Sequence, residues 1–218
     1  IALLLHVPAV RRVVLRYASA EVQRRSGIRI DAARLDYDLA SLTVGLAGVR
    51  VSADRSPDHP FFGADYLRVS LSRRVLTGSA AVDEIEVTNG SVRIVRDGNG
   101  RTNLPESAAS VEGEPAALDV THLLAPGFRV DVQDARSDLS FGIPGIDVDI
   151  GRTAGRISLV APATLSIGGR STRISTLDGG AAFDGRVLKL SNVQLRADEG
   201  STQVDGALFL LVRDPSVD

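Results

Sequence analysis

Apolar residues return at every second position through most of this 218-residue chain. Val69, for example, stands between Arg68 and Ser70. Because successive side chains of a β-strand point to opposite faces of the sheet, this spacing predicts strands with one apolar and one polar face. The residues that we expect to share the apolar face in the first half of the chain are Ile28, Ile30, Leu35, Tyr37, Leu39, Leu42, Val44, Leu67, Val69, Leu71, Ile85, Val87, Val92 and Ile94.

The alternation divides the chain into two β-rich units joined by a segment of different composition. The first unit covers residues 27–104 and the second covers 118–218, where breaks that contain glycine separate short alternating runs. Residues 105–117 are rich in Pro, Glu, Ser and Ala and have no periodicity, which predicts a loop or linker. Short connections favour antiparallel neighbours, so the sequence predicts a mostly β chain arranged as an elongated antiparallel meander.

Asn89 and Gly90 form the strongest turn signal in the first unit. They stand between apolar runs that end at Val87 and begin again at Val92. A type I′ turn needs positive φ at both central residues, and Asn-Gly tolerates this conformation best. The pair therefore predicts a two-residue hairpin between adjacent strands.

A helical period precedes the first expected strand. Between Pro8 and Ser26 the apolar residues recur at helical spacing, and Gly27 suits the position just after a helix ends. This pattern predicts an amphipathic helix with an arginine-rich flank, which either covers the core of a soluble domain or lies on an anionic membrane surface. The residues assigned to the membrane surface in the second case are Val10, Arg11, Arg12, Val13, Val14, Arg16 and Tyr17.

The first five residues form an apolar run that is too short to cross a bilayer. Because the chain starts at Ile1 and contains no methionine, we expect it to be part of a longer protein. The apolar run would then be the end of a transmembrane helix or of a signal sequence. On this interpretation residues 1–26 comprise the end of a membrane anchor followed by the amphipathic helix.

Composition argues against nucleic acid as a partner and against a metal cofactor. The net charge of −2 and an aromatic content of 4% provide neither a basic surface nor stacking platforms for bases. The chain has no cysteine, and its three histidines are far apart in the sequence. The segment 97–100 begins like a calcium loop, but Arg101 and Thr102 replace a ligand and the required glycine, so it predicts a tight turn. We expect no cofactor.

Two carboxylate pairs are the main candidates for acid–base chemistry. Asp36 with Asp38, and Asp147 with Asp149, each have the spacing that places both side chains on one face of a strand. Apolar residues alternate with them, as expected for the solvated face of a half-buried strand. This reading, and the absence of nucleophile or phosphate-loop motifs, indicates that the chain is not an enzyme.

The order of several short segments carries further information. After a basic and apolar start at residues 3–25, the segments are Gly27-Ile28-Arg29-Ile30, Leu42-Thr43-Val44, Val49-Arg50-Val51, Pro60-Phe61-Phe62-Gly63-Ala64-Asp65-Tyr66-Leu67-Arg68-Val69-Ser70-Leu71, Val75-Leu76-Thr77-Gly78, Ile85-Glu86-Val87-Thr88-Asn89-Gly90 and Asp97-Gly98-Asn99-Gly100-Arg101-Thr102-Asn103-Leu104. This order resembles the start of the AsmA-like superfamily of Gram-negative envelope proteins, which includes TamB-type members. The segments 190–195 and 204–208 resemble TamB-type repeats.

The resemblance implies a single-pass anchor in the inner membrane and a long β-sheet in the periplasm, folded like a taco into an open groove. In that family the groove is thought to carry phospholipids to the outer membrane, so its partners would be acyl chains and the inner membrane. TamB-type members are also linked to the assembly of outer-membrane β-barrel proteins, which would then be a further partner.

The residues themselves leave three ways to cover a one-faced sheet. A second sheet, closure into a barrel, or a bound ligand can each remove an apolar face from water. The first hypothesis is a groove for lipid, and the second is that exposed sheet edges pair with strands of client barrel proteins. A plain β-sandwich scaffold is the third.

Overall fold

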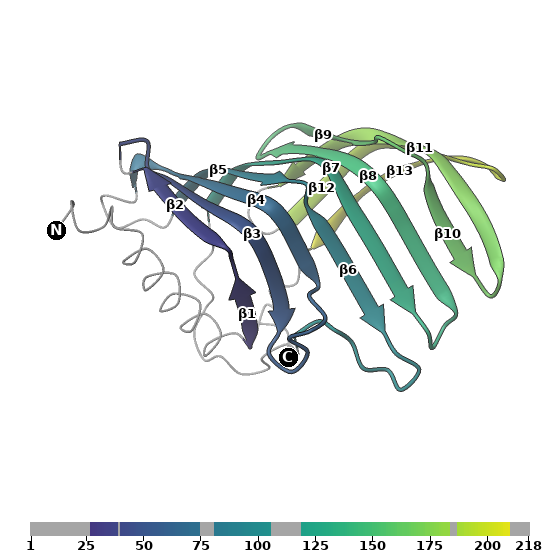
Figure 1. The fold of residues 1–218 in the computed structure, drawn as a ribbon. Helices are drawn as coiled ribbons and strands as arrows, with labels where there is room; N and C mark the ends of the chain where they lie inside the picture. The colour runs from purple at the N-terminus through teal and green to yellow at the C-terminus, as the bar shows by residue number, and fades with distance from the viewer. Residues whose placement is uncertain (1–26, 39, 75–80, 106–118, 184–186, 210–218) are drawn as a thin grey trace, which may run out of the picture.

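The computed structural model describes residues 27–38, 40–74, 81–105, 119–183 and 187–209. These residues form 13 strands that belong to one twisted and curved sheet (Figure 1), so the prediction of a mostly β chain is confirmed. Three predicted features lie outside the described residues: the helix expected before Gly27, the face residue Leu39, and almost all of the linker expected at 105–117. The seven positions assigned to a membrane-surface helix also lie outside them.

Strand lengths vary from short edge segments to long central strands. In chain order the strands are β1 (Ile28–Asp31), β2 (Arg34–Asp38), β3 (Thr43–Ala53), β4 (Phe62–Leu71), β5 (Ala81–Thr88), β6 (Ser91–Arg96), β7 (Asp119–Asp134), β8 (Leu139–Gly151), β9 (Gly155–Leu159), β10 (Ala163–Ile167), β11 (Arg170–Phe183), β12 (Val187–Ala197) and β13 (Gly200–Phe209).

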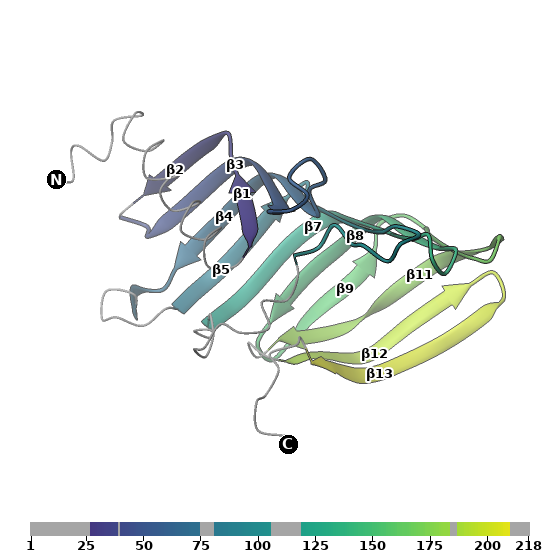
Figure 2. The same cartoon turned by 90° about the horizontal axis from the view of Figure 1, so that it is seen from below.

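Strands that follow one another in the chain are neighbours across most of the sheet, as Figure 2 shows. The order is β1-β3-β4-β5-β7-β8-β10-β11-β12-β13, while β2 pairs with β3, β6 pairs with β4 and β7, and β9 pairs with β8 and β11. Most pairs are antiparallel as expected, but β5 and β6 both run parallel to β7. The long connection between Arg96 and Asp119 allows this, because it can return the chain to the other end of the sheet before β7 begins.

The hairpin predicted at Asn89 and Gly90 is wrong. Strands β5 and β6 do not pair with each other; they lie one after the other in the gap between β4 and β7. Only Asn89 of the two has a positive φ, of 50°, and its side-chain amide donates a hydrogen bond to Asp65 Oδ2 at 2.8 Å. The Asn-Gly pair therefore joins two halves of one strand line instead of reversing the chain.

Left-handed residues restore the apolar face at four of the positions where the period-two alternation breaks. In β7, Ala125 and Phe128 face apolar partners on β8 although they are three positions apart. The residue with positive φ between them, Gly127, adds one position and so shifts the alternation, as in a β-bulge. The same odd spacing occurs at three other positions. We call the four residues the reset residues: Gly48, Asn89, Gly127 and Asn192.

Aspartates on neighbouring strands hold two of the reset residues by their backbone. Asp147 Oδ1 accepts a hydrogen bond from the Gly127 N–H at 2.8 Å, and Asp205 Oδ1 accepts one from the Asn192 N–H at 2.5 Å. The hydrogen bond from Asn192, followed by one from Gln203, lowers the pKa of Asp205. These carboxylates thus replace the strand partner that a backbone N–H loses at a bulge.

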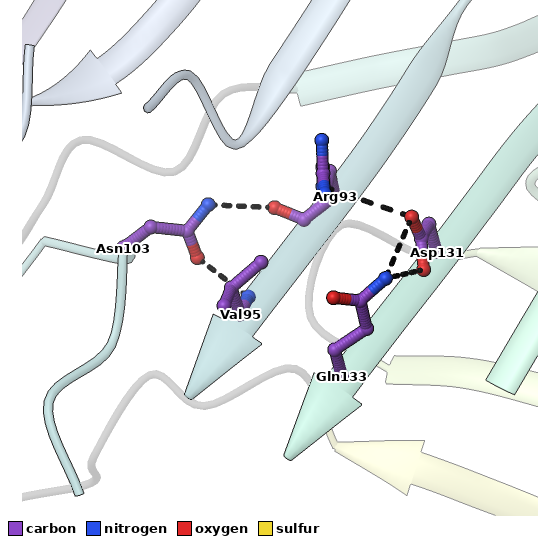
Figure 3. A network of polar contacts seen from close by, with 5 residues as sticks. All are labelled: Arg93, Val95, Asn103, Asp131 and Gln133. Atoms are coloured by element: carbon purple, nitrogen blue, oxygen red, sulfur yellow. Dashed lines mark hydrogen bonds and ion pairs between the residues drawn. The ribbon is translucent and has the colours of Figure 1, made fainter. Parts of the chain in front are cut away.

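Asn103 closes an open strand edge on β6. Strand β4 pairs only with the first two residues of β6, and the Asn103 side chain takes its place further along. The side chain donates from Nδ2 to the Arg93 carbonyl at 2.8 Å and accepts from the Val95 N–H at 2.9 Å (Figure 3). Its own N–H donates to the Val95 carbonyl at 3.1 Å, and its exposed fraction is 7%. The turn before it is tight, with the Arg101 N–H donating to Asp97 Oδ1 at 2.8 Å, which confirms the turn expected at 97–100.

Replacing Gly127 by alanine should destabilise the sheet, because alanine is strained at the positive φ of 59°. The expected loss in the free energy of unfolding is about 1–2 kcal/mol. Gly142→Ala is the matched control: an added Cβ meets no heavy atom within 4 Å at either glycine, and Gly142 does not have a positive φ. Chemical denaturation of both variants checks this prediction; equal stability would show that the left-handed conformation costs alanine nothing.

Gly90→Val should destabilise the protein for a steric reason. A Cβ at this position would lie 2.5 Å from Val87 Cγ1 and 2.6 Å from two ring carbons of Phe128. Overpacking of this kind costs roughly 1–3 kcal/mol. A double-mutant cycle with Phe128→Ala measures the coupling, and the valine should cost less once the ring is removed. Strictly additive effects would contradict the contact.

Candidate functional site

The candidate functional site is the apolar face of the sheet, which runs across its strands as rows of facing residues. Residues directly opposite each other in paired strands share a face. The rows are Tyr37–Val44–Val69–Ile85–Leu123–Ile150, Leu35–Leu46–Leu67–Val87, Ile30–Val51–Phe62–Val92–Val130–Ile143 and Ile94–Val132–Phe141–Leu165. Since several rows cross from the first unit into the second, the two predicted units form one surface.

Only small or medium-sized apolar residues are deeply buried in this face. Val49 is 2% exposed and Ala163 is 1% exposed, whereas no large side chain in the described residues falls below 2%. Leu46, Leu67 and Phe62 pack against the first buried cluster and remain half-buried. All described strands belong to one sheet, so these residues contact neighbours within a single layer. Within the described residues, no second protein layer covers the apolar face.

Phe128 joins the two halves of the apolar face. It packs against the cluster around Val49 and against the cluster around Ile146. Its ring centroid lies 6.4 Å from that of Phe62, with 31° between the ring planes. Such tilted aromatic pairs are mildly favourable, so the two rings link β4 with β7 across the intervening β6.

The structure places most of the fourteen predicted face residues in these rows. Ile28 faces Ala53 and Leu71 faces Val82 at the ends of their strands, while Leu42 lies in the turn before β3 with a φ of 53°. The fourteen did not include the second-unit partners or the residues after Gly48 in β3. The same alternation marks these residues in the sequence. A strict period of two misses those that follow a reset residue, because each reset residue shifts the alternation by one position.

The opposite face is polar, and several of its charges are paired along and between strands. Arg34 donates from Nε to Asp36 at 2.7 Å on the same strand. Between strands, Arg156 makes a two-pronged contact with Asp178 at 2.7 and 2.8 Å. The hydrogen bonds from Arg156 lower the pKa of Asp178. These exposed pairs fit a solvated strand face, and such pairs add little stability.

The two predicted carboxylate pairs each serve the local backbone or a cross-strand contact. Asp38 Oδ1 accepts a hydrogen bond from the Ala40 N–H at 2.8 Å. Of the hydrogen bonds that lower the pKa of Asp38, this one has the largest effect. Asp147 holds Gly127, as described above, and Asp149 contacts His122.

His122 lies between two carboxylates on the polar face. Its Nε2 is 2.7 Å from Asp149 Oδ1 on β8, and its Nδ1 is 3.1 Å from Glu84 Oε2 on β5. The hydrogen bond with Asp149, supported by that with Glu84, raises the pKa of His122 against the opposing effect of burial. The imidazole thus bridges three strands and connects the parallel pair β5–β7 to the antiparallel pair β7–β8.

Comparisons of this chain with protein-family models, with curated proteins and with solved structures give no match. Within the described ranges, no group of three or more His, Asp or Glu side chains is arranged to hold a metal ion. None of the helices in the part of the chain that the structure describes has the length and apolar character needed to cross a membrane.

The His122 bridge should make stability depend on pH. Because its pKa is raised in the folded state, the contribution is fully present below the unfolded value of about 6.5 and is lost as pH rises through the folded value. His122→Gln should therefore lower the melting temperature more at about pH 5.5 than at about pH 8.5. His59→Gln, in the loop after β3, is the control. An equal effect of His122→Gln at both pH values would contradict the bridge.

Proposed function

We propose that the apolar face binds the acyl chains of phospholipids. The observation that carries this proposal is the set of apolar rows that cross the sheet, in which the Leu and Phe side chains stay half-buried while Ile143 and Ile150 are buried. A sheet with one apolar face needs a cover, and a linear aliphatic ligand can supply it without any second protein layer.

The energetics favour aliphatic chains over a small polar ligand. Each buried CH₂ contributes about 0.8 kcal/mol, so an acyl chain lying along several rows gains affinity from its whole length. The rows consist mainly of Val, Ile and Leu, with few rings and no charged side chain among the facing residues. Nothing in such a surface selects one polar group, and binding would depend on apolar area.

In the wider proposal, the protein moves phospholipids between the inner and outer membranes of a Gram-negative envelope. This part rests on the resemblance of residues 3–104 to AsmA-like proteins, with the chain anchored in the inner membrane and its bulk in the periplasm. The apolar face would be the inside of an open groove along which lipids pass. No covalent chemistry is involved, so the protein would act as a conduit that supports outer-membrane biogenesis and would need no cofactor.

A second candidate function uses the edge of the sheet. Strand β13 is the last strand in the order, and no described strand pairs with its outer edge. An open edge can accept a strand from another protein through backbone hydrogen bonds. On this alternative the protein assists the assembly or translocation of outer-membrane β-barrel proteins by pairing with their strands.

Adjacent residues on β10 provide a matched test of the lipid proposal. Leu165 is half-buried on the apolar face opposite Phe141, whereas Thr164 is exposed on the other face opposite Arg173. Leu165→Asp places a charge where acyl chains would lie, at a desolvation cost of a few kcal/mol. It should reduce photo-crosslinking to a phospholipid with a diazirine in its acyl chain several-fold, and Thr164→Asp should leave crosslinking unchanged.

Circular dichroism and thermal melts of both variants accompany the crosslinking. If Leu165→Asp folds and crosslinks lipid as well as the parent, the apolar face does not bind acyl chains. If Leu165→Asp unfolds the protein while Thr164→Asp does not, the face is a closed protein core, and the sandwich scaffold replaces the lipid proposal.

A further inference from the structure

A row of residues on the polar face brings two arginines to either side of a small gap. Arg50 faces Gly63, Gly63 faces Ser91, and Ser91 faces Arg129 in consecutive register pairs across β3, β4, β6 and β7. Three strand spacings place the two arginine Cα atoms roughly 14 Å apart. Between them stand a glycine and a serine, two residues with small side chains.

The gap is an open hollow with a volume of about 880 Å³. Arg50, Arg93 and Arg129 all line it, together with Ser91 and Gly63. A Cβ added to Gly63 would lie 3.5 Å from Ser91 Oγ, so the missing side chain is what leaves the floor of the hollow open. Pro60 and Phe61 also line it.

The arginines of the hollow are available to an anion. Within the described residues, neither Arg50 nor Arg129 has a carboxylate partner. Arg93 is 3.7 Å from Asp131, and Gln133 also donates to that carboxylate, at 3.3 and 3.5 Å (Figure 3). The cations in this hollow are therefore free or only loosely paired.

Two carboxylates also line the hollow, and both already have partners. Asp31 accepts hydrogen bonds from Arg29 at 2.9 and 3.4 Å, and Asp65 accepts one from the Asn89 amide at 2.8 Å. Asp31 also faces Arg50 in register, on the side of Arg50 away from Gly63, and Arg29 offsets its charge. The lining therefore carries three arginines and two carboxylates, with Arg50 and Arg129 on either side of Gly63.

We propose that this hollow binds a phosphate group carried by an organic ligand. Guanidinium groups match the geometry of phosphate oxygens and can bind two at once, and Arg50 and Arg129 can approach one phosphate from opposite sides. The Ser91 hydroxyl donates a further hydrogen bond from the floor, and Phe61 and Pro60 pack against the organic part. The ligand is either a soluble phosphate ester or the headgroup of a phospholipid, which present the same chemistry.

This site is independent of the acyl-chain proposal. Val49 and Phe62 also line the hollow, but Arg50 and Gly63 alternate in sequence with Val49, Val51 and Phe62, so the Arg50 side chain points to the opposite face of the same strands. An acyl chain on the apolar face and a phosphate in the hollow would occupy different sides of one layer.

Binding of glycerol 3-phosphate to the full chain tests the proposal, measured by isothermal titration calorimetry at low ionic strength. Arg50→Gln and Arg129→Gln should each weaken binding about tenfold, the loss expected for one charge-assisted contact. Gly63→Val should abolish binding by filling the floor, with the fold retained because this glycine does not have a positive φ. Arg170→Gln, an exposed arginine at the β10–β11 turn, should bind like the parent.

Co-sedimentation with phosphatidylglycerol vesicles distinguishes the two sources of phosphate. Binding of glycerol 3-phosphate without vesicle binding identifies a soluble ester as the ligand. Binding of both, each lost in Gly63→Val, identifies a lipid headgroup. The proposal is overturned if glycerol 3-phosphate does not bind, or if Arg170→Gln weakens binding as much as Arg50→Gln. Vesicle binding that survives Gly63→Val and Arg129→Gln would be general surface attraction; glycerol 3-phosphate binding that these variants lose would then identify a soluble ester as the ligand, and glycerol 3-phosphate binding that survives them would overturn the proposal.

Discussion

A single-layer sheet keeps its apolar residues together only if every break in the period-two alternation is corrected. Here left-handed residues make the correction at four of the breaks. Gly127 and Asn192, for example, each add one position, and the apolar side chains on both sides of them face the same way. Asp147 and Asp205 satisfy the backbone N–H groups that these residues would otherwise leave without a strand partner. The continuous apolar face, and any function assigned to it, depends on this arrangement.

Much of the fold follows from the alternation in the sequence, and its failures have physical causes. The strands and their apolar faces were predictable because period two is a local property of each strand. The pairing of β5 and β6 with β7 was not, since it depends on where a long connection returns the chain. Asn-Gly was read as a hairpin because the same positive φ that suits a reversal also suits a bulge within a strand line.

The candidate site was predictable in part for the same reason. The facing of Val44, Val69 and Ile85 follows from shared parity within neighbouring strands. By contrast, the role of Asn103 as a side-chain substitute for a missing strand has no periodic signal. The hollow around Gly63 also had none, because residues that are far apart in the sequence become a row only once the register of four strands is known.

Native mass spectrometry of the purified full chain, without detergent, tests most directly whether an apolar ligand covers the open face. The account predicts added masses that correspond to phospholipids, which disappear on delipidation and return when phospholipid vesicles are supplied. A protein that always appears at its bare mass, folded and unchanged by vesicles, would contradict it.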